Sequence, residues 1–529
     1  MRKASYWLAA MVGLTLILSA CSSEEDINPD NRNLKHITFT AGQSQTRTII
    51  DGTDATQINW EAGETISILD GTSTTRSFTL TGEAGKPEGT FEGMAQEKSS
   101  YTAVYPYQKD GLKLNGNSVE GAWLDPVQTA TAGTFDRKAN LMMARTKGDD
   151  KILQFHNMTA FVKVTPQMDC EQITIVSADS TVALAGTMTM TLNENGTVET
   201  KVTGNASHQV SLTGDIKAGQ TYYIAIAPAA LKDGIRMGIT TKEGKHYCKD
   251  ASKSVAFTAN KVLNLGSISD KQMNWLPYVT FSAKAEQKVT LNEYLPTVES
   301  IEYSTDYGRH WNYFAPNQAY SFGKTTRLML RGNNPNGTAT DKHGEYSHFT
   351  FGNDQTDVAC SGDIRTLVKW ANYQNADTKN ARFKYLFYSS TVLTSAPDLP
   401  ATELATDCYD AMFFECTNLK KAPELPATQL STSCYAYMFH SCTSLVESPV
   451  LAAESLTSHC YHAMFGDCTN LKKVTMLATS ADKNKDTNSL DTWLQGTTGG
   501  TLYVNSSVVN NEYLKANVPE GWKIDPVGE

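Results

Sequence analysis

The sequence predicts a mainly β protein with two β-sandwiches, a further small β domain and a C-terminal solenoid of α/β repeats. Short runs rich in Thr, Val, Ile and Tyr recur between Gly, Asn and Asp clusters over residues 37 to 270. A further β-rich stretch covers residues 276 to 350, and a 26-residue period follows from Phe383 to Ala478. Short strands with dense turn signals are typical of antiparallel sandwiches, and a fixed period indicates stacked repeats.

The N-terminus has the order of a lipoprotein signal peptide over residues 1–20. Two basic residues precede an uncharged apolar run of 12 residues, Trp7 to Leu18, and a small-residue segment ends directly before Cys21. This run is shorter than the roughly 20 residues of a membrane-spanning helix. The segment resembles a lipobox, which implies cleavage before Cys21 and acyl chains that anchor the chain through this residue. An ordinary secretory cleavage is the alternative.

Residues 21–36 are polar and acidic, with Glu24-Glu25-Asp26 near their start, and predict a flexible tether. The acidic start resembles the signal that sends lipoproteins to the outer face of the outer membrane in Gram-negative anaerobes. We therefore expect a surface-exposed protein whose first partner is the outer membrane, contacted through the lipid.

Net charge and cysteine content argue against two classes of protein, nucleic-acid-binding proteins and scaffolds dense in disulfides. The net charge of −10 argues against binding nucleic acid through its phosphates. Ten cysteines leave nine after Cys21, an odd number, so a dense disulfide scaffold is not expected. The sequence leaves the redox state of Cys170, Cys248 and Cys360 open.

The two sandwiches are predicted over residues 37–147 and 148–272, with the polar stretch 145–151 as their seam. This region resembles the fimbrillin (Mfa-like) family in four ordered segments, which are Thr46-Arg47-Thr48, Trp60 to Ile66, Tyr223 to Pro228 and Leu263 to Gly266. The resemblance implies transthyretin-like sandwiches. It also implies maturation by cleavage after Arg47, which would open a groove for a donor strand from another pilus subunit.

Residues 273–352 are predicted to form a small β domain with one hairpin that resembles an Asp-box. The segment Ser304 to Trp311 has the spacing S-x-D-x-G-x-x-W. We expect the Asp306 carboxylate to accept turn amides, Gly308 to take a positive φ and Trp311 to pack beneath the turn. A hydrolase acting on surface glycans is the alternative, but it would need several such boxes, and the sequence shows one.

Residues 353–529 are predicted to form the solenoid with its caps. The columns with a 26-residue step include Phe387, Phe413, Phe439 and Phe465, and Leu393, Leu419, Leu445 and Leu471. Each unit is too small to bury its own apolar face, so stacking must supply the core. Within a unit, Cys408 to Glu415 is predicted to be a short helix with one inward stripe of Cys408, Tyr409, Met412, Phe413 and Cys416.

The six repeat cysteines are predicted to be a ladder of buried thiols. Across such a helix two cysteines lie roughly 12 Å apart, and equivalents in packed helical units lie roughly 8 to 10 Å apart, both beyond disulfide reach. Disulfides and zinc remain the alternatives, although no C-x2-C spacing is present.

The repeat pattern Cys-Tyr-x-x-Met-Phe-x-x-Cys-Thr-x-Leu, followed by a Pro-flanked Leu, resembles BspA-type leucine-rich-repeat surface proteins between Cys408 and Leu477. This resemblance implies a leucine-rich-repeat solenoid. Ahead of it, Ile364, Leu367, Val368 and Ala371 predict a short capping helix, and residues 493–504 predict the closing cap.

The sequence contains no G-x-S-x-G, H-E-x-x-H, P-loop or dinucleotide motif, so we expect no enzyme, catalytic residue, cofactor or metal. The leading hypothesis is a surface adhesin that displays the repeats. Its exposed variable positions include Lys420, Lys421, Lys472 and Lys473, which could bind an acidic polymer on a host matrix protein or glycan; a merely solvated face is the alternative. A pilus tip or accessory subunit, cleaved after Arg47, is the second hypothesis.

Overall fold

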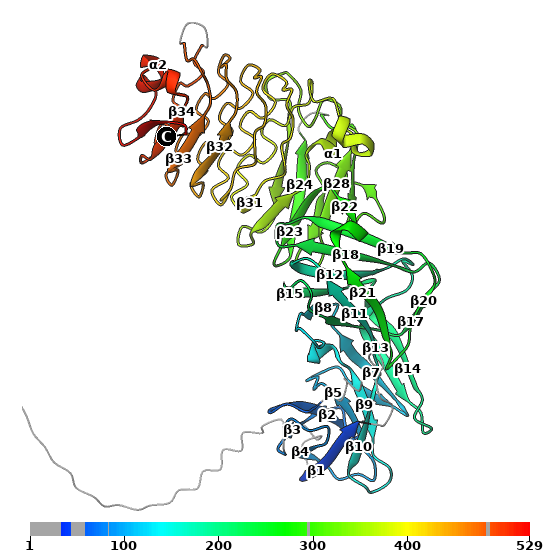
Figure 1. The fold of residues 1–529 in the computed structure, drawn as a ribbon. Helices are drawn as coiled ribbons and strands as arrows, with labels where there is room; N and C mark the ends of the chain where they lie inside the picture. The colour runs from blue at the N-terminus through cyan, green and yellow to red at the C-terminus, as the bar shows by residue number, and fades with distance from the viewer. Residues whose placement is uncertain (1–32, 44–58, 83, 294–296, 483–486, 529) are drawn as a thin grey trace, which may run out of the picture.

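The protein is an elongated, curved series of β units that ends in a stack of coils (Figure 1). The computed structural model describes residues 33–43, 59–82, 84–293, 297–482 and 487–528. Cys21 and Arg47, with the predicted signal peptide and most of the tether, lie outside the described residues. None of the helices in the described ranges is long and apolar enough to cross a membrane.

The first unit is a closed barrel with the strand order β1-β10-β9-β5-β2-β3-β4. Along β1, the buried Ile37, Phe39 and Ala41 alternate with exposed residues, as expected for a strand with one face toward a core. Trp60 fills the barrel and contacts the rings of Phe91, Tyr105 and Phe155. The strands are β1 Leu34–Gln43, β2 Thr65–Leu69, β3 Arg76–Leu80, β4 Gly89–Gln96, β5 Thr102–Tyr105, β9 Met142–Arg145 and β10 Ile152–Asn157.

The prediction of a sandwich over residues 37–147 is wrong, because the sheet closes on itself. β1 pairs antiparallel with β4 at one edge and parallel with β10 at the other. Sandwiches and barrels both bury every second side chain, so the alternation in the sequence does not distinguish them. The closing strand β10 begins at Ile152, on the far side of the predicted seam.

The second unit contains strands from both sides of the predicted seam at residues 145–151. β7 pairs with β13, and β8 runs parallel to β15. Its sheets have the orders β16-β11-β21, β22-β19-β18-β12-β15-β8, β14-β13-β7-β6 and β17-β20, and their inward side chains share one core. The strands are β6 Lys113–Asn115, β7 Ser118–Leu124, β8 Val127–Thr129, β11 Ala160–Pro166, β12 Cys170–Ser177, β13 Ala185–Leu192, β14 Val198–Ser207, β15 Gln209–Ile216, β16 Tyr222–Ile226, β17 Ala229–Leu231, β18 Ile235–Thr241, β19 His246–Ala251, β20 Val255–Phe257, β21 Val262–Ile268 and β22 Asn274–Leu276.

The third unit has two sheets, β26-β25-β28-β23-β30-β31 and β27-β24-β29. Its last strand, β31, belongs to the first coil of the stack and pairs in parallel with β30. One hydrophobic core therefore runs without interruption from Val279 in the third unit to Leu514 near the C-terminus. The strands are β23 Val279–Ala283, β24 Gln287–Glu293, β25 Ile301–Ser304, β26 Asn312–Tyr313, β27 Ala319–Phe322, β28 Leu328–Gly332, β29 Ser347–Phe351, β30 Val358–Ser361 and β31 Leu393–Ser395.

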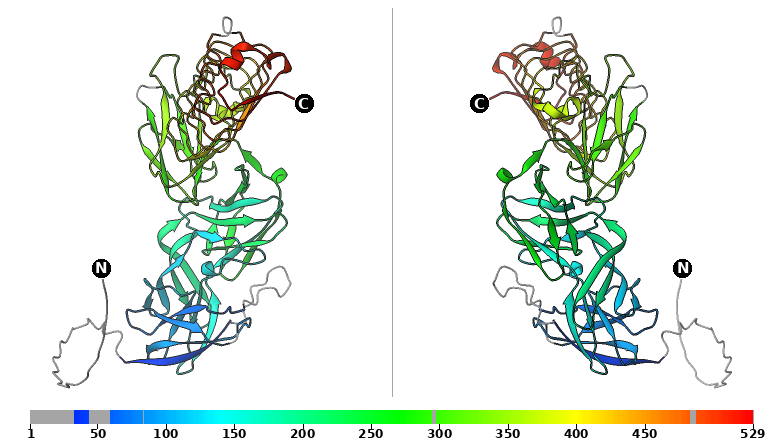
Figure 2. Two further views of the ribbon diagram at one scale, coloured as in Figure 1. Left: turned by 90° about the vertical axis from the view of Figure 1, so that its left-hand side faces the viewer. Right: turned by 90° about the vertical axis from the view of Figure 1, so that its right-hand side faces the viewer.

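The coils of the C-terminal stack lie side by side, with a parallel sheet of order β32-β33-β34-β35 along one side (Figures 1 and 2). The predicted capping helix is only α1, Arg365–Val368, and Ala371 falls in the exposed 3-10 segment that follows. The remaining elements are β32 Glu447–Leu451, β33 Lys473–Met476, β34 Thr501–Val504, β35 Lys523–Pro526, α2 Glu512–Ala516 and the 3-10 helices Arg137–Ala139, Asp270–Gln272, Trp370–Asn375 and Ser506–Val508.

The predicted helix from Cys408 to Glu415 is wrong in conformation, although its inward stripe is buried as expected. Ala411 and Glu415 have φ of 49° and 58°, which an α-helix does not allow. The amide of Tyr409 donates to the carbonyl of Cys434 at 3.0 Å, and that of Phe413 to Met438 at 2.9 Å. The segment is a series of turns, because alternate amides bond to the next coil instead of to their own.

The expected spacing of about 8 to 10 Å between equivalent cysteines assumed that the units pack as helices. Because the units are not helical, this expectation is wrong too. Coils bonded backbone to backbone lie closer, and the rings of Phe387 and Phe413 have centroids 5.4 Å apart. The nine described cysteines are buried and form no disulfide, which confirms the predicted burial of the repeat thiols. The Sγ atoms of Cys416, Cys442 and Cys468 each donate to a carbonyl of the preceding coil, at 3.1, 3.1 and 3.0 Å.

Candidate binding surfaces

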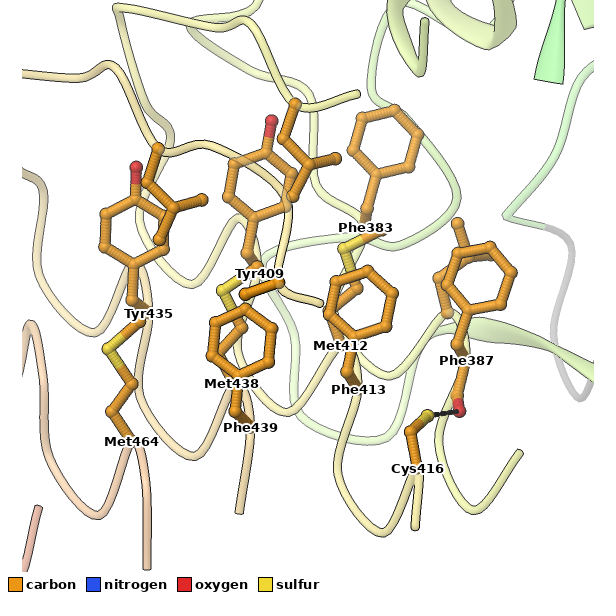
Figure 3. Close-up of a cluster of buried hydrophobic side chains, with 14 of the residues drawn as sticks. Phe383, Phe387, Tyr409, Met412, Phe413, Cys416, Tyr435, Met438, Phe439 and Met464 are labelled. Atoms are coloured by element: carbon orange, nitrogen blue, oxygen red, sulfur yellow. Dashed lines mark hydrogen bonds between the residues drawn. The ribbon is translucent and has the colours of Figure 1, made fainter. Parts of the chain in front are cut away.

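The repeat columns place equivalent side chains directly over one another. Figure 3 shows Phe387, Phe413 and Phe439 in one buried ladder and Phe383, Tyr409 and Tyr435 in a second. The planes of successive rings in the first ladder differ by 5°, at centroid distances of 5.4 and 5.6 Å. These ladders hold the coils in a fixed register, so exposed positions recur at a regular spacing along the stack.

The predicted lysine face lies along the side of the stack that carries the parallel sheet. Lys420, Lys421, Lys472 and Lys473 are all exposed. Glu447 stands in register with Lys473 and forms an ion pair with it, which raises the pKa of Lys473. The four lysines are therefore two pairs, separated by a coil that carries a carboxylate.

Contacts within the stack distinguish the two lysine pairs. Lys472 Nζ donates to Thr498 Oγ1 at 2.6 Å and to the carbonyl of Gly499 at 3.3 Å. With Lys473 held by Glu447, the second pair is engaged by the protein itself. At the equivalent positions of the first coil, Thr394 and Ser395 donate to carbonyls of β30. The pair Lys420 and Lys421 is thus the stronger candidate for an external anion.

The hairpin around Asp306 has the local geometry that its residue spacing favours. Asp306 Oδ1 accepts the amides of Arg309 and His310, each at 3.0 Å. Gly308 has a φ of 73°, and Trp311 Nε1 donates to its carbonyl at 3.0 Å. The Asp306 carboxylate is therefore occupied by groups of its own turn, since its Oδ2 atom also lies 2.6 Å from His310 Nδ1.

Sequence reasoning missed Tyr307, which has a φ of 56° in the same hairpin and points into the second unit. Its ring lies against Gly238, where an added Cβ would be 2.6 Å from the ring. Its hydroxyl lies 3.0 Å from Thr240 Oγ1, which lies 3.0 Å from His246 Nδ1. The only signal in the sequence was Gly238 inside strand β18, because a glycine within a strand often marks the close approach of another part of the chain.

A second missed feature is a group of partly exposed aromatic rings beside the hairpin. The Arg331 guanidinium lies between the rings of Trp311 and Trp370, at 4.2 and 3.8 Å from their centroids. Tyr278 packs edge-on against Trp311 at 4.7 Å. The hairpin, β28, the 3-10 segment Trp370–Asn375 and the link between β22 and β23 supply these side chains, which are far apart in the sequence and have no shared spacing to reveal them.

No group of three or more His, Cys, Asp or Glu residues in the described part of the chain is arranged to hold a metal ion. His246 is fully buried, and desolvation lowers its pKa to about 3, so it stays neutral near pH 7. Its Nε2 atom lies 3.2 Å from Ser361 Oγ, which places it in a hydrogen-bonded chain between two units.

Comparison with known proteins gives solved structures of low sequence and structural similarity, three of which are described here. No family model matches the chain, and no curated protein matches it. A proposed cell adhesion protein from Bacteroides uniformis is 19% identical with a TM-score of 0.31, over 45% of this chain and 95% of that one. A fimbrial protein from Bacteroides ovatus is 13% identical with a TM-score of 0.26, over 44% and 50%. The tip fimbrial protein Mfa3 from Porphyromonas gingivalis is 9% identical with a TM-score of 0.24, over 46% and 98%.

Proposed function

We propose that the protein is a lipid-anchored, non-catalytic adhesin of the cell surface, which displays a BspA-type leucine-rich-repeat stack at the end of a β stem. The observation that carries this proposal is the fixed register of the stack, in which the core columns repeat and the exposed positions vary. The equivalent positions 394–395, 420–421, 446–447 and 472–473 hold Thr-Ser, Lys-Lys, Val-Glu and Lys-Lys. A regular frame with variable side chains is the usual binding surface of solenoid proteins.

The expected ligand of this face is an acidic polymer, carried by a host matrix protein or glycan. Lys420 and Lys421 are exposed on adjacent positions of one coil, where two charges can meet neighbouring anionic groups. Exposed charges contribute mainly to encounter and to salt-dependent affinity, so binding should weaken as salt rises.

Retention of the mature chain on immobilised heparin tests this proposal. Residues 279–514 share one core, so a fragment that starts at Phe383 would cut through it and the whole mature chain is used. We expect the double variant Lys420→Glu, Lys421→Glu to elute at lower salt. The matched control is Lys113→Glu, Lys201→Glu, which makes the same charge change at exposed positions of the second unit. Equal losses in both variants, or none in either, would reject the lysine face.

A second candidate function is a pilus tip or accessory subunit, which the position of β1 favours. β1 ends at Gln43, before Arg47, and lies between β4 and β10 in the barrel. Cleavage after Arg47 would separate this strand from the rest of the chain, and its loss would leave a slot between two strands that could accept a strand from another subunit. Some 260 residues follow the second unit, which favours a terminal over a shaft position.

N-terminal sequencing of the surface-exposed protein separates the two functions. A start at Thr48 supports the pilus subunit, and a lipidated Cys21 supports the anchored adhesin. The variant Arg47→Ala is the control for the first outcome, because it should abolish a start at Thr48 without changing the barrel strands.

A further inference from the structure

The aromatic group beside the Asp306 hairpin continues across the junction of the second and third units. Trp275, on the edge strand β22 of the second unit, lies 6.3 Å from the ring of Tyr373, centroid to centroid. Tyr373 shares its 3-10 segment with Trp370. The group therefore runs from Tyr278 and Trp311, over Arg331 and Trp370, to Tyr373 and Trp275. Figure 1 shows β22, β28 and α1 on the same side of the molecule.

These rings are held in place without being enclosed. Trp275 is 42% exposed, and Tyr278, Trp311, Trp370 and Tyr373 are all half-buried. Trp311 is fixed by its bond to Gly308, and Arg331 Nε donates to Glu302 Oε2 at 2.7 Å. Rings that are fixed before binding lose little conformational entropy when a ligand arrives, so a preformed aromatic surface favours affinity.

The charged groups that contact these rings are already paired. Arg331 is bound to Glu302, and Arg365, whose guanidinium lies 5.8 Å from the Tyr373 ring centroid, is bound to Asp363 at 2.8 Å. A polyanion or a basic peptide would have to displace one of these partners. The surface therefore fits a neutral ligand.

The kinds of side chain indicate which neutral ligand fits. Among the described residues from 273 to 375, the large apolar side chains that are exposed are Trp275 and Tyr313, and both are aromatic. A protein partner of ordinary size would be expected to meet aliphatic surface as well. A pyranose ring has an apolar C–H face that stacks on an aromatic ring and hydroxyls that bond to polar groups. Asn372, Gln374 and Asn375 lie in the same 3-10 segment as Trp370 and Tyr373.

We infer that the rings of Trp275, Trp311, Trp370 and Tyr373, arranged around Arg331, form a binding surface for a neutral glycan. This surface is separate from the lysine face of the stack. It lies where two β units meet, a common location for ligand sites. The proposed adhesin would thus have two sites of different chemistry, one for acidic and one for neutral polymers.

Affinity electrophoresis of the mature chain in gels that contain starch, laminarin, yeast mannan or xylan tests the inference. We expect at least one polymer to slow the chain, and Trp275→Ala to weaken that binding at least about tenfold, the effect of losing one anchoring ring. The matched control is Trp123→Ala, since Trp123 is 40% exposed on β7 of the second unit. Trp370→Ala should also weaken binding, and Lys420→Glu, Lys421→Glu should not.

Three outcomes would overturn the inference. These are no retardation of the wild-type chain by any neutral polymer, unchanged retardation of Trp275→Ala and Trp370→Ala, or an equal loss in Trp123→Ala. Circular dichroism verifies the fold of each variant. If Trp370→Ala unfolds, Trp275→Ala decides alone, because a side chain with 42% exposure can be shortened at little cost to the core. Failure of heparin binding by the lysine variant would leave this result unaffected.

Discussion

The hydroxyl of Tyr307 lies 3.0 Å from Thr240 Oγ1, and this bond joins the third β unit to the second. Tyr307 is 2% exposed and belongs to a small apolar cluster with Val176, Cys248 and Met329. A single side chain from the Asp306 hairpin thus supplies both a polar and an apolar contact across the junction. The hairpin therefore contributes directly to the contact between the second and third units.

We expect Tyr307→Ala to destabilise the chain by about 3–5 kcal/mol, because it removes a large buried ring and leaves a cavity. Tyr307→Phe should cost about 1 kcal/mol, the value of one hydrogen bond. Differential scanning calorimetry measures both effects in the transition of the second and third units. Tyr313→Ala, at a 63% exposed site on the neighbouring strand β26, is the control and should change little. Equal effects of Tyr307→Ala and Tyr313→Ala would contradict this role.

The burial of His246 makes the junction sensitive to acid. Its pKa of about 3 in the folded chain lies below the usual histidine value of 6.5, so the unfolded chain binds the proton more strongly. The stability from neutral His246 is fully present above about pH 6.5 and is lost as the pH falls from there toward 3. The slope for one proton is at most about 1.4 kcal/mol per pH unit. Urea unfolding at pH 7 and pH 5 should show a smaller pH dependence for His246→Gln than for the wild type.

The sequence predicted the composition of the cores better than the paths of the backbone. The buried stripe of Cys408, Met412 and Phe413 follows from hydrophobic spacing, which does not depend on whether the chain coils as a helix or as turns. The turns themselves depend on bonds such as that from Tyr409 to Cys434, 25 residues away, which local propensity cannot reveal. The barrel was missed for the same reason, since the pairing of β1 with β10 is a long-range contact.

The candidate sites also divide into features that follow from local sequence and features that depend on contacts between distant segments. The spacing of Asp306, Gly308 and Trp311 predicts a local turn, and the structure has that turn. Tyr307 and the aromatic surface depend on contacts between distant segments, and no motif marks them. The lysine positions follow from the 26-residue period, but the pairing of Lys473 with Glu447 requires the register of β32 and β33.

The buried repeat thiols should be unreactive in the folded chain. Burial raises the pKa of Cys416, Cys442 and Cys468, to about 12 for Cys468, and only the thiolate is a good nucleophile. In a Cys21→Ser chain we expect Ellman's reagent at pH 8 to detect no repeat thiol before unfolding and all nine cysteines in urea without reductant. A count below nine in urea would show that disulfides are present.

The predicted lipidation of Cys21 can be tested independently of any ligand. If its thiol carries acyl chains, the protein should enter the detergent phase of a Triton X-114 separation, and Cys21→Ser should leave it in the aqueous phase. Cys170→Ser is the matched control, because Cys170 is a buried residue of β12. Aqueous partition of the wild-type chain would mean either that no lipid is attached or that cleavage after Arg47 has removed it, and N-terminal sequencing separates these two cases.

The pilus hypothesis requires that β1 can leave the barrel and that another strand can take its place, and this exchange can be tested directly. A chain that starts at Thr48 lacks β1, so the edges of β4 and β10 are left unpaired and Phe39 no longer fills the core. We expect this chain to melt at a lower temperature and a synthetic peptide of residues 34–43 to restore the loss. The same peptide with Phe39→Asp should not restore it, because it would bury a carboxylate without a partner. Fluorescence anisotropy of the labelled peptide gives the affinity. If both peptides bind equally, or neither binds, the slot between β4 and β10 does not accept a strand.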